Sequence, residues 1–262
     1  MKLCIDIGNT DIHAGVFDGP TLVAEFRKSN QWRPTVDEFG LFLLQILRIK
    51  AIEPGAITAV SIASVVPDAQ GAVTGACERY LSRKPLILRA GVRTGLKLRV
   101  KEPSEVGADR IANAIAAVAR HPNRDLLVID TGTATTICVI TAAAEYMGGV
   151  ITPGLGLAMR ALGQGTAKLP LVDILRPEHA LGRTTIENIQ SGLYFGHVGM
   201  LRELLHRLRE EVFPDTRPAI IGTGGFAHLF AEEGIFDEIV PDLVLRGLLH
   251  ALELNTPASS NA

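Results

Sequence analysis

Two short stretches of the sequence carry the residue types that bind phosphate groups and metal ions. The first is an apolar run, residues 3–7, which contains Asp6 and is followed by Gly8, Asn9 and Thr10. A carboxylate inside an apolar strand is costly unless it is paired or bound to a cation. Glycine lets a phosphate approach the backbone, and the two polar side chains donate hydrogen bonds to its oxygens. The stretch indicates a nucleotide site in which Asp6 holds a metal ion directly or through water; a turn aspartate that caps Asn9 or Thr10 is the alternative.

The second stretch repeats this plan in the other half of the chain. An apolar run from residue 126 ends in Asp130. Gly132 and several hydroxyl side chains follow, and residues 135–140 are expected to form a second strand. One such hairpin is weak evidence for a site, but two in one chain favour a pair of loops that grip a phosphate chain from both sides. The P-loop pattern Gly-x-x-x-x-Gly-Lys-Ser/Thr does not occur.

A third candidate segment precedes an alanine-rich helix predicted at residues 111–119. Asp109 and Arg110 fall in its first turn, where exposed backbone N–H groups favour anions. Asp109 is therefore either a residue matched to the helix dipole or a functional carboxylate. Arg110 is either a clamp for a carboxylate or phosphate or an ordinary surface arginine.

Composition limits the classes of protein to which the chain can belong. With 262 residues, of which 47% are hydrophobic, the chain can bury a sizeable core. The net charge of -2 argues against a dedicated nucleic-acid binder. No apolar stretch approaches the roughly 18 residues of a membrane span and no signal peptide is visible, so we expect a cytoplasmic protein without a membrane partner. Cys4, Cys77 and Cys138 are far apart, and we expect them to be reduced and buried.

Hydrophobic periodicity predicts alternating strands and helices after an initial β-meander. Thr35 and Glu38 have the spacing of a capping box at the start of the first helix. Glycine-rich turns at 148–154 and 223–225 allow close approach of a ligand or close packing of two elements. The predicted strands are 3–7, 12–16, 21–27, 59–63, 85–88, 126–130, 135–140, 145–152 and 218–222. The later helices are 69–81, 111–119, 155–162, 186–211 and 226–231, and the stretch 239–254 carries a final helix after Pro241.

The two halves share the order strand, Asp-Gly loop, strand, strand, followed by alternating helices and strands. We interpret this as an internal duplication. The predicted fold class is α/β, with two duplicated actin-like (ribonuclease H-like) domains and a central cleft. The predicted domains are residues 1–118, with the first phosphate loop and the substrate segment, and residues 119–262, with the second phosphate loop and an adenosine-side turn.

Taken together, these motifs resemble the type III pantothenate kinase family, from Asp6 to about Leu254. The family belongs to the acetate kinase, sugar kinase, Hsp70 and actin superfamily, in agreement with the duplicated plan. The matching segments occur in the family's order and are residues 6–10, Pro103 with 107–110, 130–136, 148–154, Thr185 with 190–192, and 223–225.

The resemblance implies ATP-dependent phosphorylation of pantothenate to 4′-phosphopantothenate, the first step of coenzyme A biosynthesis, by a homodimer whose pantothenate site the partner subunit completes. It implies Asp109 as general base, Asp130 as the ligand of a monovalent cation (K⁺ or NH₄⁺), and Mg²⁺ near Asp6. The implied ATP contacts are Asp6, Ile7, Gly8, Asn9, Thr10, Asp11, Ile12, His13 and Thr133, and the implied substrate contacts are Gly107, Ala108, Asp109, Arg110 and Thr185.

Two positions depart from the family pattern. Val100 stands where the family commonly has a tyrosine, so a hydroxyl and an aromatic wall of the pantothenate pocket are missing. Cys138 stands where an acidic residue is common. Two alternatives therefore remain beside the pantothenate kinase: a non-catalytic relative that acts as a regulatory accessory factor, and a kinase of the same fold for another small alcohol.

Overall fold

The structure is a computed structural model that describes residues 1–30 and 34–256. It forms two compact units. Unit 1 comprises Met1–Arg120 and the chain from Asp242 onward, and unit 2 is His121–Pro241. The expected boundary between residues 118 and 119 lies close to this division, whereas the last helix belongs to unit 1. The final residues of the expected second domain, 257–262, lie outside the described residues.

Unit 1 is built on one mixed sheet with the strand order β3-β2-β1-β4-β5. The antiparallel meander runs through β1 (Lys2–Ile7), β2 (Asp11–Asp18) and β3 (Thr21–Ser29), as the alternating pattern predicts. On its other side β1 pairs in parallel with β4 (Ala59–Ser64), which pairs with the short β5 (Leu86–Ile87).

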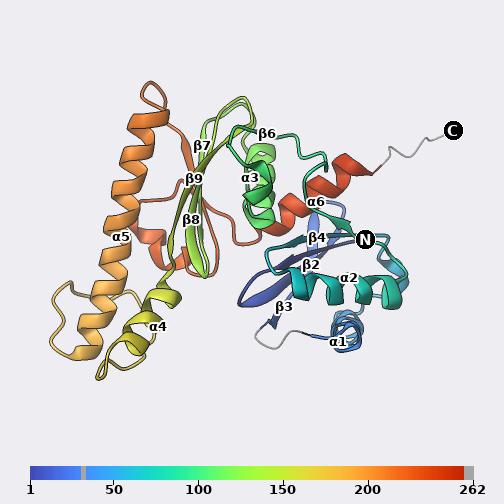
Figure 1. The fold of residues 1–262 in the computed structure, drawn as a ribbon, viewed down its shortest axis with the longest axis horizontal. Helices are drawn as coiled ribbons and strands as arrows, with labels where there is room; N and C mark the ends of the chain where they lie inside the picture. Colours follow the sequence, from blue (N-terminus) through green and yellow to red (C-terminus); the bar gives the residue numbers. More distant parts are fainter. Residues whose placement is uncertain (31–33, 257–262) are drawn as a thin grey trace. The chain divides into compact units, whose positions relative to one another are not determined.

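Helices cover both faces of this sheet (Figure 1). On one face, α1 (Val36–Ile49) and α2 (Pro67–Leu81) bury their apolar stripes against Leu3, Ile5 and Ile7. On the other face, α3 (Ala108–Arg120) and α6 (Leu243–Asn255) pack around Cys4 and Ala63. The expected capping box starts α1: Glu38 N–H donates to Thr35 Oγ1 over 3.2 Å and Thr35 N–H donates to Glu38 Oε2 over 2.7 Å.

Unit 2 repeats the topology of unit 1. Within it the strand order is β11-β10-β7-β8-β9. The strands β7 (Leu126–Thr131), β8 (Ala134–Ile140) and β9 (Glu145–Pro153) form the antiparallel meander, and β7 pairs in parallel with β10 (Ala219–Thr223), as β1 does with β4. The predicted duplication is therefore confirmed strand by strand.

One face of this second sheet is covered by α4 (Leu155–Gly165), the long α5 (Thr185–Val212) and the 3₁₀ helix η3 (Ala227–Glu233). Their buried side chains pack on Leu127, Ile129 and Ile220. None of the described helices is long and apolar enough to cross a bilayer.

Four sequence expectations differ from the structure. The helix expected at 226–231 is the 3₁₀ helix η3. Glu238–Ile239 forms the parallel strand β11, which was not predicted, and the final helix, expected after Pro241, begins at Leu243. The short strand β6 (Lys97–Leu98) was not predicted. A 3₁₀ turn, η2 (Pro103–Glu105), precedes α3, which starts three residues earlier than expected. Elements of two to seven residues carry too little periodicity to be found in this way.

Candidate functional site

The first loop is a tight connection between β1 and β2. Gly8 N–H donates to the backbone oxygen of Asp11 over 2.9 Å, which closes the turn around residues 9 and 10. A Cβ on Gly8 would lie 3.2 Å from the same oxygen, so a side chain would crowd the turn. The predicted phosphate loop is thus a backbone-lined turn with polar side chains at its tip.

Asn30 holds this loop from the end of β3. Its buried side-chain amide donates from Nδ2 to the backbone oxygen of Gly8 over 2.8 Å, and its backbone N–H donates to the oxygen of Thr10 over 2.9 Å. This role of Asn30 was not predicted from the sequence. A buried asparagine just after a strand that returns beside the loop is the signal that points to it, because such a polar group needs a partner.

A chain of polar side chains runs from the loop across β2 and β3. Asp11 Oδ2 accepts from Arg27 Nη1 over 2.9 Å, and Arg27 Nη2 lies 3.2 Å from His13 Nδ1. His13 Nε2 lies 2.7 Å from Glu25 Oε1. Because a guanidinium only donates, Nδ1 of His13 accepts, so the ring proton sits on Nε2 and is donated to Glu25. Burial, and then the charge of Arg27, lower the pKa of His13, which keeps the imidazole neutral.

The second loop surrounds Asp130 with glycines. Gly132 N–H donates to the oxygen of Ala134 over 3.1 Å. A Cβ on Gly132 would lie 3.3 Å from Asp130 Oδ1, and a Cβ on Gly224, whose φ is +89°, would collide with the same oxygen. A Cβ on Gly154 would collide with the backbone oxygen of Gly132. The space beside the Asp130 carboxylate therefore exists because two neighbouring residues lack side chains, and a third glycine lets β9 pass close to the loop.

The strand after this loop is anchored by a buried histidine. Thr135 Oγ1 lies 3.1 Å from His197 Nε2, and the ring of His197 stacks on Phe230 at a centroid distance of 5.3 Å. Burial lowers the pKa of His197 to about 4, so the ring is neutral at pH 7. On the preceding strand, Thr131 Oγ1 donates to the backbone oxygen of Thr223 over 3.0 Å, which joins the predicted turn at 223–225 to this loop.

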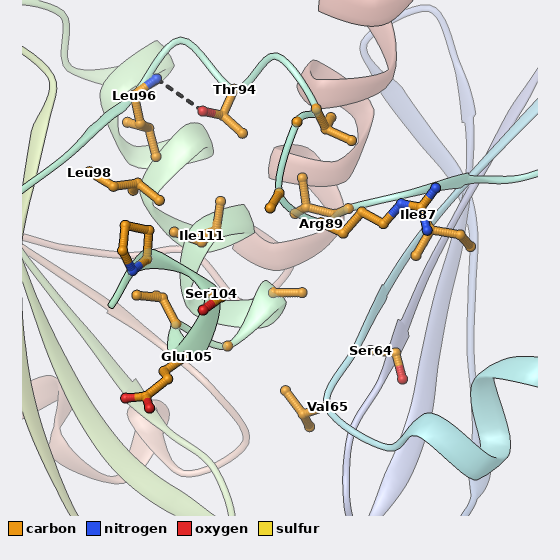
Figure 2. Close-up of a pocket in the computed structure, with 18 of the residues that line it drawn as sticks. Ser64, Val65, Ile87, Arg89, Thr94, Leu96, Leu98, Ser104, Glu105 and Ile111 are labelled. Atoms are coloured by element: carbon orange, nitrogen blue, oxygen red, sulfur yellow. Dashed lines mark hydrogen bonds between the residues drawn. The ribbon is translucent and has the colours of Figure 1, made fainter. Parts of the chain in front are cut away.

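A cavity of about 740 Å³ lies in unit 1 beside the N-terminus of α3. Figure 2 shows it between the segment after β4, the segment that follows β5, and η2. Its walls are mainly apolar, and Arg89 and Glu105 are the charged side chains among them. The lining residues used below are Val65, Leu96, Leu98, Gly107, Ala108 and Ile111.

Asp109 follows this lining segment directly. It stands in the first turn of α3, and its Oδ1 accepts from the backbone N–H of Arg110 over 2.8 Å. Burial raises the pKa of its carboxyl group, which the backbone N–H of Arg110 only partly offsets. A side chain at Gly107 would collide with Asp109 Oδ1, so glycine is required for this placement of the carboxylate. Arg110 and Val100 are both half-buried.

The Asp6 and Asp109 segments are brought together within unit 1. Val65 N–H donates to the backbone oxygen of Ile7 over 3.2 Å, and a Cβ on Gly107 would lie 3.5 Å from the Val65 side chain. The ends of β1 and β4 therefore adjoin the start of α3. Asp130 and Thr133 belong to the second unit, as does Thr185, which is exposed as the first residue of α5 after its N-cap Thr184.

A metal ion held by protein side chains alone needs a cluster of several ligands. The described residues contain no group of three or more His, Cys, Asp or Glu side chains placed to hold a metal ion. Mg²⁺ in phosphoryl-transfer sites needs only one or two carboxylates, because phosphates and water supply the other ligands, so a lone Asp6 fits that role. The glycine-lined space at Asp130 fits a cation bound by oxygen atoms. The three cysteines are free and buried, as predicted, and burial raises the pKa of Cys4 and of Cys77 to about 12.

Comparison with known proteins gives a consistent result. Residues 2–207 match the model of a family described as type III pantothenate kinase. The chain is 48% identical over 256 residues to "Type III pantothenate kinase" of Legionella pneumophila (strain Corby), covering 98% of this chain and 100% of that protein.

Solved structures agree on the fold at low sequence identity. A putative 2-dehydro-3-deoxygalactonokinase from Sinorhizobium meliloti matches with a TM-score of 0.60 and 14% identity, over 100% of this chain and 99% of its own. A putative Baf family transcriptional activator from Campylobacter jejuni matches with a TM-score of 0.61 and 18% identity, over 97% and 98%. At these identities the likeness concerns the fold, which is the predicted duplicated actin-like fold.

Proposed function

The chain belongs to the type III pantothenate kinase family, and from that membership we propose how its residues carry out the ATP-dependent phosphorylation of pantothenate. Asp109 is the general base. It accepts the proton of the pantothenate hydroxyl as that oxygen attacks the γ-phosphorus of ATP, and ADP leaves. Phosphoryl transfer depends mainly on positioning and charge neutralisation, so one well-placed carboxylate is sufficient.

The observation that carries this assignment is the half-buried position of Asp109 beside a cavity. Burial raises the pKa of its carboxyl group, which makes the carboxylate a stronger base than an exposed aspartate. Gly107 and Ala108 line the cavity just before it. The apolar side chains of Leu96, Leu98 and Ile111 suit the dimethyl-substituted pantoyl part of the substrate.

The phosphate side is assigned to the two loops. The backbone and polar tips of residues 6–13 bind the ATP phosphates, with Thr133 as a further contact from the second loop. Mg²⁺ near Asp6 neutralises phosphate charge when ATP is bound. A monovalent cation, K⁺ or NH₄⁺, fits the space at Asp130 that Gly132 and Gly224 leave beside the carboxylate.

A homodimer is proposed from the surface of unit 2. Large apolar side chains are exposed along α4 and the segment that leads to α5, and a monomer rarely leaves so many exposed in one stretch. Thr185 is exposed at the end of this stretch, next to Ile186, which fits a residue that completes the partner subunit's pantothenate site. We place the reaction in the cytoplasm. The exposed apolar residues are Leu157, Leu162, Leu171, Leu175, Leu181 and Ile186.

The test is replacement of the base. Asp109→Asn keeps the shape of the side chain but cannot accept the proton, so we expect kcat to fall about 10²–10⁴-fold. Thermal unfolding and ATP binding are measured alongside, and both should stay close to wild type. Glu102→Gln, an exposed carboxylate in the same segment, is the matched control and should keep full activity. Full formation of phosphopantothenate by Asp109→Asn, detected by mass, would show that another group takes the proton.

A further inference from the structure

The face of the first sheet that carries Asp6 also carries an arginine that the sequence analysis did not single out. Residues opposite one another on neighbouring strands share a face, and Asp6 pairs with His13, which pairs with Arg27. With strands about 4.8 Å apart, Arg27 stands about 10 Å from Asp6, two strands away in one row. Asp11 lies two residues before His13 and so shares this face.

Two of the five guanidinium N–H groups of Arg27 have partners within the described residues. Nη1 donates one to Asp11 and Nη2 donates one to His13, which leaves three. The side chain is 49% exposed, so a ligand can reach it from solvent. Asp11 and His13 hold the guanidinium in one orientation, and Glu25 holds His13 in turn. A fork fixed in this way loses little entropy when it binds an anion bidentately.

The charges around Arg27 indicate which kind of ligand its remaining N–H groups bind. This face of the meander presents three acidic side chains, Asp6, Asp11 and Glu25, near a loop assigned to a polyphosphate. Such a loop needs positive charge to bind an anion.

The other two cations of β1–β3 cannot supply that charge. Lys2 is at the opposite end of β1 and donates to Glu253 over 2.7 Å. Lys28 is opposite Ile12, on the other face, and its Nζ lies 5.6 Å from the centre of the Phe42 ring. Among the cations of β1–β3, Arg27 is left as the one on this face at the loop.

We propose that Arg27 is a phosphate-binding residue of the first loop, which contacts the terminal phosphates of ATP through its remaining N–H groups while Asp11 and His13 orient it. The proposal rests on the assignment of residues 6–13 to the ATP phosphates. It adds a side chain from β3, a strand outside the expected ATP segment.

The experiment compares Arg27→Ala with Lys28→Ala, which removes the same charge from the next residue on the opposite face. ATP, ADP and adenosine binding are measured by calorimetry, and the steady-state constants for both substrates are determined. A charge-assisted pair is worth enough for Arg27→Ala to weaken ATP binding about 10–100-fold. Adenosine binding and the KM for pantothenate should not change, because neither involves the phosphates. Lys28→Ala should bind ATP like wild type, and Arg27→Lys should recover part of the loss.

Equal losses of ATP affinity in Arg27→Ala and Lys28→Ala would overturn the proposal, and so would equal losses for ATP and adenosine in Arg27→Ala, which would indicate a distorted loop. If Arg27→Ala does not fold, ¹⁵N-arginine spectra of the wild-type protein decide. A side-chain signal that is absent from Arg27→Lys should shift with ATP and not with adenosine, and no shift would overturn the proposal. Wild-type protein that binds no ATP and forms no phosphopantothenate would instead overturn the proposed function.

Discussion

The two Asp-Gly hairpins have the same strand order, yet the residues in register with each aspartate differ in charge. We call the residues that lie opposite each aspartate on neighbouring strands its row. The row in the first sheet contains a basic side chain, and the row in the second sheet contains hydroxyl and apolar groups. The two rows, each read from the parallel strand across the meander, are Ala63, Asp6, His13 and Arg27, and Thr223, Asp130, Thr136 and Ile151.

This difference suggests that one inherited plan serves two kinds of ligand. In the proposed site, the guanidinium near Asp6 attracts phosphate oxygens and the carboxylate acts through a divalent ion. A cation in the corresponding place near Asp130 would repel a bound monovalent cation, and Ile151 occupies that place instead. The glycines around Asp130 leave space beside its carboxylate, whereas the first loop carries the polar side chains of Asn9 and Thr10.

The largest effect is expected from replacing Asp6, and replacing Asp130 should have a different effect. Asp6→Asn removes the proposed ligand of the divalent ion, and because such an ion contributes several kcal/mol to transition-state stabilisation, kcat should fall about 10³-fold at every K⁺ concentration. Asp130→Asn should lower kcat much less, by about tenfold, and should abolish the response to K⁺. Turnover is measured over a K⁺ titration with total ionic strength held by a bulky organic cation. If kcat of the two variants depends on K⁺ in the same way, Asp6 and Asp130 do not bind different cations.

A smaller effect is expected from Ile151→Arg, which places a positive charge in the row of Asp130 at the position that corresponds to Arg27. Ile151 is 62% exposed, so an arginine can be introduced there without overfilling the core. The added charge should raise the K⁺ concentration for half-activation about tenfold, which corresponds to about 1.4 kcal/mol of repulsion at an effective dielectric constant near 20–40. Ile151→Gln is the neutral control and should behave like wild type. Unchanged K⁺ activation in Ile151→Arg would mean that the cation binds elsewhere.

The sequence was sufficient to predict the repeated hairpins, because each pairs an apolar run with an aspartate and a glycine turn at fixed spacing. It was not sufficient to place Arg27. If the two strands paired residue by residue outward from the turn at 18–20, His13 would pair with Phe26. Arg27 would then lie on the face of the sheet opposite to His13. The structure shows that Val23 is an extra residue in β3, since Phe17 pairs with Leu22 but Val16 pairs with Ala24. This bulge shifts the register by one residue and brings Arg27 beside His13.

The same limit applies to the cavity and to Asn30. The cavity lies between segments that carry little regular structure, including a strand and a 3₁₀ turn of two and three residues. Periodicity does not describe such segments. Asp109 was still found from its place in the first turn of the predicted helix, and Gly107 was found because its spacing from Asp109 matched the family pattern. Roles that depend on one side chain, such as the clamp by Asn30, need the strand pairing before they can be seen.

The smallest effect concerns the buried histidine of each unit. Glu25 and Asp11 counteract the lowering of the pKa of His13, whereas burial alone lowers the pKa of His197 from 6.5 to about 4. Because the folded state resists protonation of His197, the unfolded state takes up the proton first as the pH falls. Stability is therefore full above about pH 6.5 and is lost at roughly 1.4 kcal/mol per pH unit between 6.5 and 4.

Denaturant unfolding at pH 7.5 and pH 5.5 checks this prediction. Wild type should lose about 1.4 kcal/mol more than His197→Gln, which keeps a neutral hydrogen-bonding group beside Thr135 but cannot take up the proton. His206→Gln, from the exposed side of the same helix, should lose as much as wild type. If His197→Gln shows the wild-type pH dependence, the acid sensitivity comes from another group, and the two histidines do not distinguish the units.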